Sequence, residues 1–396
     1  MKALLTLLSC VCLALSASAQ LPNTLTPAEK VYGLSKFWQE VNYNFVYLDR
    51  VDRAKWDEAY KQLIVTVQKT QNDYEYYREL QRFCALLKDG HTNIYSPEMK
   101  GVALMNTNFG DYRLFIKNID HKAIIVRTNL SKKNEIPVGS EVVSVNGKST
   151  SEYIRQEVAP YISASTDYII EDWATSTLLQ GLEGDTYQVR IKKPQGQVVT
   201  LNLTHRKTSE EAVYPAFEPE RGLLDFKWYP QQIAYVSLNS FADPKISSLF
   251  VGLLPELAKA KGVIIDLRYN GGGNTSIGRE VLQYLTTDRV LYGSRSSTRM
   301  HVPSYKAWGK FTTPADTAKK PGYGKYLLSY QDKHVYRFPY APDTLESTAV
   351  PKVMVPTALL IGHATASAAE DFLIYADNQK HMVKIGSNTF GSTGQP

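Results

Sequence analysis

The sequence predicts a mixed α/β protein built in three parts. Apolar residues at a helical period mark residues 26–98, short alternating strands follow over residues 101–207, and strands alternate with helices over residues 213–396. In the last part, the continuous apolar run of residues 262–267 is typical of a strand in a sheet that helices cover on both faces. A chain of 396 residues has room for two or three domains.

Residues 1–19 have the pattern of a secretory signal peptide. Lys2 provides the charged start, and residues 3–15 form an apolar run that is too short to cross a bilayer as a stop-transfer helix. The small residues 17–19 form a cleavage site, which leaves Gln20 as the new N-terminus. We therefore expect an exported protein of a bacterial periplasm or cell envelope, or a secreted one. No later run is long and apolar enough to span a membrane.

Three helices are predicted in residues 26–98. The first has Thr26 as its N-cap, the second follows the apolar period of residues 56–67, and the third ends at Gly90 as C-cap. Cys84 lies on the apolar face of the third helix and is predicted to be a core residue. It is the only cysteine that export would leave, so no internal disulfide is expected.

The charge pattern and the spacing of polar residues exclude two classes of partner. The formal net charge is +6, but lysines and arginines are scattered, and the longest basic runs are pairs such as residues 132–133 and 319–320. A nucleic-acid-binding surface would need clustering, so no nucleic-acid partner is expected. No group of Cys, His, Asp and Glu has metal-ligand spacing, so we expect no metal and no cofactor.

The central and C-terminal parts differ in their strand pattern. The clearest hairpin signal of the central part is the Asn-Gly pair at residues 146–147. The C-terminal part has strands predicted at residues 232–238, 262–267, from 352 onward and at 381–385. Residues 296–350 are rich in Pro, Tyr and Lys with weak periodicity, and we expect a long, partly ordered excursion. Residues 391–396 have loop chemistry with no strand after them, so we expect a truncated C-terminus.

Ser367 lies where a predicted strand turns into a helix, and it has two interpretations. A serine there can be an N-cap whose hydroxyl accepts from the backbone N–H of Glu370. It can also be a nucleophile at a helix N-terminus, where the next N–H groups stabilise an oxyanion. The stretch alone does not decide between them.

The Gly-rich turn of residues 266–274 also follows a buried strand and begins a helix. Its three consecutive glycines let backbone N–H groups approach a ligand closely. It can be a plain turn, a phosphate cradle without the usual Gly-Lys-Ser/Thr sequence, or half of an oxyanion hole. Histidines are less informative, because spacing cannot choose among seven of them. His363, four residues before the serine, is assigned to the turn.

Three motifs occur together in an order that resembles a known family. They are Leu-Lys-Asp-Gly-His-Thr at residues 87–92, Asp-Leu-Arg-Tyr-Asn-Gly-Gly-Gly at 266–273 and Thr-Ala-Ser-Ala-Ala-Glu-Asp-Phe at 365–372. With a strand-rich module between the first two, the chain resembles the tail-specific (C-terminal processing) and tricorn-type serine peptidases from about residue 26 to 396. The resemblance implies an N-terminal helical domain over 26–98, a PDZ-like domain over 101–207 and a crotonase-like (ClpP/crotonase) core over 213–396.

The same resemblance assigns roles to individual residues. It implies that Ser367 is the nucleophile, that His91 is the general base, and that Gly272 and Ala368 supply the N–H groups of the oxyanion hole. The processing branch has a lysine about 25 residues after the serine, where this sequence has Ser392, so a Ser–Lys dyad looks absent. The chain is therefore more similar to the tricorn-like branch, which uses a histidine and a late glutamate.

Two details separate the chain from that branch. Gly90 stands where the tricorn protease has a serine, and the glutamate that completes the triad is expected beyond Pro396.

These inferences predict an exported serine endopeptidase that acts on unstructured protein or peptide substrates. The PDZ-like module can bind an extended peptide by strand addition. One alternative is a non-catalytic protein that binds an apolar ligand or a peptide on the same fold, as the retinoid-binding relatives of the family do. Another is a crotonase-type acyl-transfer enzyme. The oligomeric state and the cleavage site are not predicted.

Overall fold

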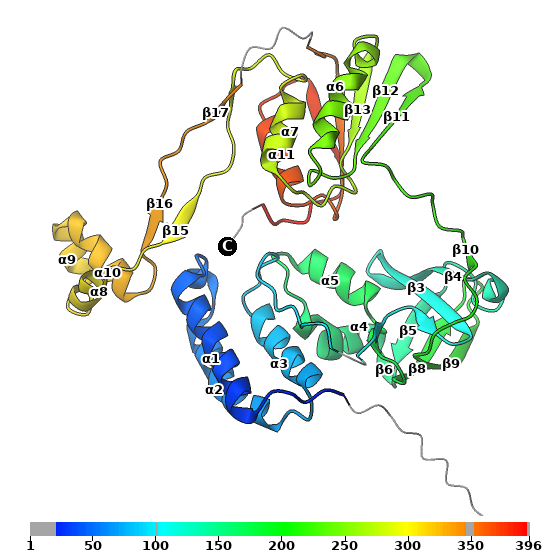
Figure 1. Ribbon diagram of the computed structural model, residues 1–396, viewed down its shortest axis with the longest axis horizontal. Coiled ribbons are helices and arrows are strands. Elements are labelled where there is room, and N and C mark those ends of the chain that lie inside the picture. The colour runs from blue at the N-terminus through cyan, green and yellow to red at the C-terminus, as the bar shows by residue number, and fades with distance from the viewer. Residues whose placement is uncertain (1–20, 100–101, 346–351, 394–396) are drawn as a thin grey trace, which may run out of the picture.

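The computed structural model describes residues 21–99, 102–345 and 352–393 (Figure 1). The expected signal peptide and the sequence around its cleavage site lie outside the described residues. No helix in the described part of the chain is long and apolar enough to cross a membrane. Three separate clusters of buried apolar side chains form, one in each of the three predicted parts. The division into domains with the predicted bounds stays a prediction.

The N-terminal part consists of three helices, α1 (Pro27–Asn44), α2 (Arg53–Thr66) and α3 (Asp73–Ala85). Thr26 caps α1 in a capping box with Glu29, and the rings of Trp56 and Phe83 stack 3.8 Å apart in the core. Cys84 is fully buried, as predicted. The predicted end of the third helix at Gly90 is wrong, because Leu86 is the C-cap and the chain turns at Lys88, whose φ is +50°.

The central part is an antiparallel sheet with helices packed against it. The strand order is β2-β3-β4-β5-β8-β9, and β10 (Val213–Tyr214) pairs with β4. The strands are β2 (Asn108–Phe109), β3 (Tyr112–Ile119), β4 (Lys122–Asn129), β5 (Glu141–Val145), β8 (Thr186–Lys192) and β9 (Val198–Thr204). The predicted Asn-Gly turn joins β5 to β6 (Lys148–Ser149), with positive φ at both residues as a two-residue hairpin turn requires. The helices are α4 (Thr150–Tyr153) and α5 (Asp167–Ser176).

The C-terminal part is a five-stranded sheet in the order β11-β12-β13-β18-β19. The strands are β11 (Leu224–Tyr229), β12 (Ile233–Leu238), β13 (Gly262–Asp266), β18 (Thr357–Ile361) and β19 (Met382–Gly386), and the last four run parallel. The strand predicted from residue 352 therefore begins five residues later. The helices are α6 (Lys245–Leu257), α7 (Thr275–Leu282) and α11 (Ala368–Ala376). The mixed α/β class is as predicted.

The three helices of this part share one core with one face of the sheet. Val236, Ile265 and Leu359 belong to the buried cluster that includes α6, α7 and α11. Ile264 and Ala358, on the other face of the same strands, are only half-buried. The sequence predicted helices on both faces of this sheet, but among the described residues they cover one face only.

Between α7 and β18 the chain leaves the sheet, and Figure 1 shows this excursion projecting toward the N-terminal helices. Two short ribbons, β14–β17 and β15–β16, lead out to three helices. We call residues 297–338 the arm. It comprises β15 (Ser297–Arg299), α8 (Pro303–Gly309), α9 (Pro314–Lys319), α10 (Gly324–Tyr330) and β16 (Val335–Arg337). The ribbons that connect it are completed by β14 (Val290–Leu291) and β17 (Asp343–Thr344).

Candidate active site

Ser367 occupies an unusual backbone conformation between β18 and α11. It is the N-cap of α11, and its N–H donates to Glu370 Oε2 at 3.0 Å, but the Glu370 N–H donates to the Ser367 carbonyl at 2.7 Å and not to the hydroxyl that the N-cap interpretation requires. Its φ of +53° and ψ of −123°, however, differ from the extended conformation that N-cap residues normally adopt. A positive φ is strained for a residue with a Cβ, and such strain persists only where the surrounding contacts enforce it.

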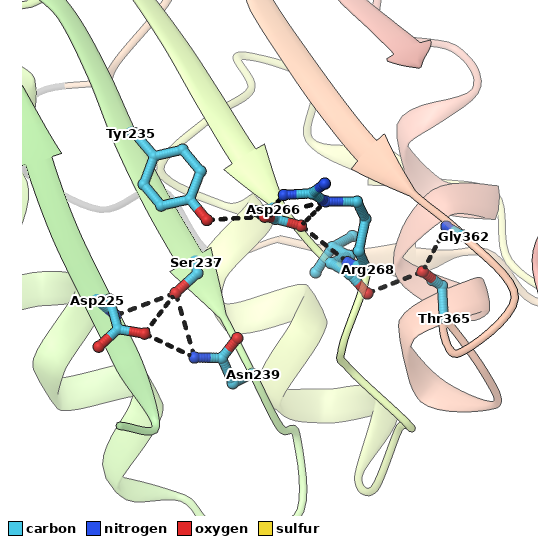
Figure 2. Close-up of polar contacts among 9 residues, drawn as sticks. Asp225, Tyr235, Ser237, Asn239, Asp266, Arg268, Gly362 and Thr365 are labelled. Atoms are coloured by element: carbon cyan, nitrogen blue, oxygen red, sulfur yellow. Dashed lines mark hydrogen bonds and ion pairs between the residues drawn. The ribbon is translucent and has the colours of Figure 1, made fainter. Parts of the chain in front are cut away.

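The buried Thr365 enforces the path of this turn. Its hydroxyl donates to the Leu267 carbonyl at 2.8 Å and accepts from the Gly362 N–H at 3.1 Å (Figure 2). One residue later, the Ala366 N–H donates to the Asn270 carbonyl at 3.0 Å. The turn that carries Ser367 is therefore fixed to the Gly-rich turn that follows β13.

Asn270 is fully buried and shapes the Gly-rich turn itself. Its side-chain amide donates to the Leu238 carbonyl at 3.0 Å, and its Oδ1 accepts from the Gly272 N–H at 3.0 Å. Gly272 has a φ of +97°, and a Cβ there would lie 2.7 Å from the Ser367 Cβ and 2.9 Å from the Ala368 nitrogen. The two turns predicted to carry the chemistry are thus in contact, and the contact requires glycine.

The two predicted oxyanion donors differ in their availability. The Gly272 N–H already donates to Asn270. The Ala368 N–H, in contrast, has no acceptor among the described residues. In this state only one of the two N–H groups is free to bind a ligand oxygen.

Asp266 anchors the start of the Gly-rich turn at the end of β13. Its buried carboxylate accepts from Arg268 at 2.7 Å and from the Tyr235 hydroxyl at 2.7 Å (Figure 2). Burial disfavours the ionised form of Asp266, but these hydrogen bonds outweigh it and hold its pKa below the ordinary value. A second cluster on the same face, Asp225 with Ser237 and Asn239, joins β11 to β12. Both clusters are structural, because neither contacts Ser367.

Glu370, one turn into α11, is the residue that the sequence interpretation undervalued. Its carboxylate is buried and accepts four hydrogen bonds. Oε2 accepts from the N–H groups of Ser367 at 3.0 Å and Ser392 at 2.9 Å, and Oε1 accepts from the Thr389 hydroxyl at 2.6 Å and the Gly391 N–H at 2.7 Å. Glu370 therefore ties Ser367 to residues 389–392.

His91 reaches the same segment from the N-terminal part. Its Nδ1 forms a hydrogen bond with the Ser392 hydroxyl. A Cβ on Gly90 would lie 2.8 Å from the Phe390 ring and 3.0 Å from the Ser392 Oγ, so glycine is what lets the segment approach. Among the described residues, no direct hydrogen bond joins His91 to Ser367. Their connection runs through Ser392 and Glu370.

Two further side chains that lie near Ser367 in the sequence, Lys384 and His363, are engaged elsewhere. Lys384 pairs with Asp377. His363 pairs with Asp172 of α5, and its ring stacks on Tyr168 at 5.0 Å. His363 therefore links its turn to the central part of the chain. No cluster of three or more His, Cys, Asp or Glu that could hold a metal occurs in the part of the chain that the structure describes.

Residues 232–396, which contain both turns, match the model of peptidase family S41. This region belongs to peptidase family S41. The match indicates a peptidase of the serine type. No curated protein sequence matches the chain.

Solved structures share the fold of this chain over nearly its whole length. Mature CPAF complexed with lactacystin has 15% sequence identity and a TM-score of 0.62, and the match covers 93% of this chain and 85% of that one. Mature CPAF alone has 14% identity and a TM-score of 0.59, with 92% and 84% covered. At these identities the likeness establishes a common fold, which includes the helical and central parts as well as the S41 region.

The central part also touches the S41 region next to the candidate site. The Tyr168 hydroxyl donates to the Thr389 carbonyl at 2.8 Å, and the Thr166 hydroxyl donates to the Phe390 carbonyl at 3.3 Å. The ring of Trp173 lies 5.2 Å from the ring of Phe390. No sequence signal marks these contacts, because each joins residues more than 200 positions apart.

A cavity of about 610 Å³ opens beside Ser392, between the N-terminal helices and the S41 region. Phe45, Trp56 and Leu87 form apolar parts of its wall, and Arg50 and Asp89 contribute charges. Neither Ser367 nor His91 lines it. The cavity is thus adjacent to the candidate site and is not the place where Ser367 would react.

Proposed function

We propose that the protein is an exported serine endopeptidase that hydrolyses peptide bonds of unstructured protein or peptide substrates. The observation that carries this proposal is the strained backbone of Ser367, at a strand–turn–helix junction and packed against Gly272. A strained turn of this kind exposes a nucleophilic serine at the edge of a sheet and places the next N–H groups near its hydroxyl. An ordinary N-cap needs neither the strain nor the glycine.

In this proposal Ser367 attacks the scissile carbonyl while His91 accepts its proton. A covalent acyl-enzyme forms, the proton passes from His91 to the leaving amine, and a water molecule then releases the acyl group by the reverse sequence. The bond to Ser392 supports the assignment of His91, because Nε2 is the basic nitrogen in the tautomer whose Nδ1–H donates to the Ser392 hydroxyl. Ser392 would thus be a positioning residue.

Stabilisation of the tetrahedral oxyanion would come from the N–H groups of Ala368 and Gly272. Each such donor is worth roughly 3 kcal/mol of barrier in comparable sites. Because the Gly272 N–H donates to Asn270, it would have to share its hydrogen with the substrate oxygen. We therefore expect Ala368 to be the stronger donor.

The finer fold assignments belong to the same proposal. The parallel β12-β13-β18-β19 sheet with helices after β13 and β18 fits a crotonase-like core. The antiparallel central sheet with α4 and α5 fits a PDZ-like module that grips an extended substrate by strand addition. The contacts of Tyr168 and Thr166 with residues 389–390 would connect that grip to the site. Export rests on the signal-peptide pattern of residues 1–19.

The test is hydrolysis of casein by the chain that begins at Gln20, compared with its Ser367→Ala variant. We expect the wild-type protein to degrade casein and the variant to be inactive with an unchanged circular dichroism spectrum. Lactacystin, which forms a complex with CPAF, serves as a probe that should modify the wild type and not the variant. Equal casein hydrolysis by both purified proteins would show that Ser367 is not the nucleophile.

The alternative is a non-catalytic binding protein on the same fold. The apolar part of the 610 Å³ cavity is the observation that favours it. The same assay separates the two, since a binding protein would leave casein intact and would not react with lactacystin.

A further inference from the structure

All of the chain's excess positive charge lies on the arm, residues 297–338. This segment contains eight lysines and arginines and two aspartates, a net charge of +6. The whole chain of 396 residues also has a formal net charge of +6, so everything outside the arm is balanced. These basic residues all lie within one contiguous segment, and that segment projects from the rest of the C-terminal part (Figure 1).

The structure does not neutralise this charge. Asp332 pairs with Lys306 at 2.7 Å, and Asp316 forms the capping box of α9 with the N-cap residue Thr313. Six basic side chains are exposed and have no carboxylate at ion-pair distance among the described residues: Lys310, Lys319, Lys320, Lys325, Lys333 and Arg337. A cluster of uncompensated like charges creates a local potential that attracts anions.

The arm also leaves its large apolar side chains outside any core. Its only buried residues are Gly309 and Ser329. Trp308 and Phe311 are 65% and 76% exposed, and further exposed apolar residues are Met300, Tyr323, Leu328, Tyr330, Tyr336 and Phe338. Helices α8 and α10 hold together by close backbone approach, because a Cβ on Gly309 would lie 2.1 Å from the Tyr326 carbonyl oxygen. Exposed aromatic side chains gathered in this number mark an interaction surface.

The base of the arm is fixed, while its helical end lies away from the candidate site. His301, just after β15, bonds to the Tyr43 carbonyl of α1 at 2.5 Å, and the two rings lie 5.2 Å apart. Figure 1 shows α8, α9 and α10 at the far end of the arm, beyond α1. The arm is therefore placed to bind something without blocking Ser367.

We propose that the arm binds the surface of an anionic lipid bilayer, with its lysines at the phosphate headgroups and Trp308 and Phe311 in the interfacial layer. Lysine combined with aromatic rings is the composition that bilayer interfaces favour. A second copy of the arm is a poor partner, because two surfaces of charge +6 repel each other. An acidic polypeptide would satisfy the lysines, but it would not require exposed rings such as Trp308 and Phe311. The inference does not depend on the proposed peptidase activity.

The test is co-sedimentation with vesicles of phosphatidylglycerol and phosphatidylcholine, or of phosphatidylcholine alone. The chain that begins at Gln20 is used, so that the apolar run of residues 3–15 contributes nothing. We expect binding to the anionic vesicles only, and binding that weakens as the salt concentration rises from about 50 to about 500 mM, because salt screens exposed charges. Each basic residue near such a surface strengthens partitioning about fivefold, so Lys310→Gln, Lys319→Gln and Lys320→Gln together should reduce it about 100-fold.

The control variant removes the same charge elsewhere, at the exposed Lys227, Lys245 and Lys261. It should bind less than about fivefold more weakly than the wild type. Trp308→Ser with Phe311→Ser should reduce binding about tenfold at constant charge. Circular dichroism and the thermal midpoint verify that all variants fold. Equal binding to neutral vesicles, equal losses in the arm and control triples, or binding to polyglutamate with none to vesicles would overturn the proposal.

Discussion

Replacing Glu370 with glutamine tests the link between Ser367 and the segment that contacts His91. The wild-type carboxylate accepts four hydrogen bonds, three of them from backbone N–H groups. Glutamine keeps the shape but offers one oxygen acceptor and one NH₂ donor. In the wild type each carboxylate oxygen accepts from two donors, so in the variant the NH₂ group must face two donors that it cannot accept from.

The structure allows the cost to be worked out. If the NH₂ replaces Oε1, the Thr389 hydroxyl can rotate to accept, but the Gly391 N–H loses its partner. If the NH₂ replaces Oε2, the N–H groups of Ser367 and Ser392 both lose theirs. Hydrogen bonds to a charged group contribute about 1.5–3 kcal/mol each. Even when the NH₂ replaces Oε1 and only the Gly391 N–H loses its partner, the remaining hydrogen bonds are made to a neutral amide and are weaker. We expect a loss of about 3 kcal/mol in the free energy of unfolding.

Urea unfolding followed by circular dichroism measures the stability, and peptide hydrolysis measures kcat. We expect a urea midpoint lower by about 1 M and a kcat at least about tenfold lower, because Ser392 would no longer hold His91 in place. The matched control is Glu280→Gln on the exposed side of α7, where the carboxylate accepts from Ser247 at 2.7 Å. A Glu370→Gln protein with the wild-type midpoint would refute the stability argument, and a normal kcat would refute the route from Glu370 to His91.

Three further predictions concern the same region. Gly272→Ala should abolish casein hydrolysis, since the new Cβ would lie 2.7 Å from the Ser367 Cβ. The control is Gly271→Ala, whose Cβ would have no atom within 4 Å and which should therefore keep wild-type hydrolysis. His91→Ala should remove most of kcat/KM and Lys384→Ala little, because His91 is the proposed general base; the reverse result would indicate a lysine base. Asp266 has a lowered folded-state pKa, so its ionised form stabilises the fold above the unfolded value of about 3.9, and this stability is lost as pH falls through the lower folded pKa. The difference in urea midpoint between wild type and Asp266→Asn should therefore be larger at pH 7 than at pH 3, and a constant difference would contradict this.

The meeting of the two turns could be predicted because local sequence and sheet topology both determine it. β13 and β18 are adjacent parallel strands, so their carboxyl ends lie at the same edge of the sheet. Asp266 to Asn274 follows one of them, and Ser367 follows the other. Since each turn is read from its own short motif, neither depends on distant residues. Their roles in chemistry stay a prediction.

The rest of the candidate site depends on contacts that no local pattern encodes. Ser392 and His91 are 301 residues apart, and the sequence offered Ser392 only as the position where a lysine is missing. Glu370 fits the first turn of a helix on dipole grounds alone, so nothing local shows that its carboxylate binds residues 389–392. The arm was predicted as partly ordered for a related reason. Its helices α8, α9 and α10 have six or seven residues and bury no large apolar side chain, so no helical period appears in their sequence.

The segment of residues 389–392 is where the three parts of the chain meet. His91 comes from the helical part, Thr166 and Tyr168 come from α5 of the central part, and Glu370 comes from the S41 region. A substrate held by the central part would pull on α5, and α5 contacts the carbonyls of Thr389 and Phe390 directly. Because the Ser392 hydroxyl bonds to His91 within the same segment, movement of α5 would change the position of the proposed base. The geometry of the candidate site therefore depends on contacts among all three parts of the chain, and the S41 region alone does not determine it.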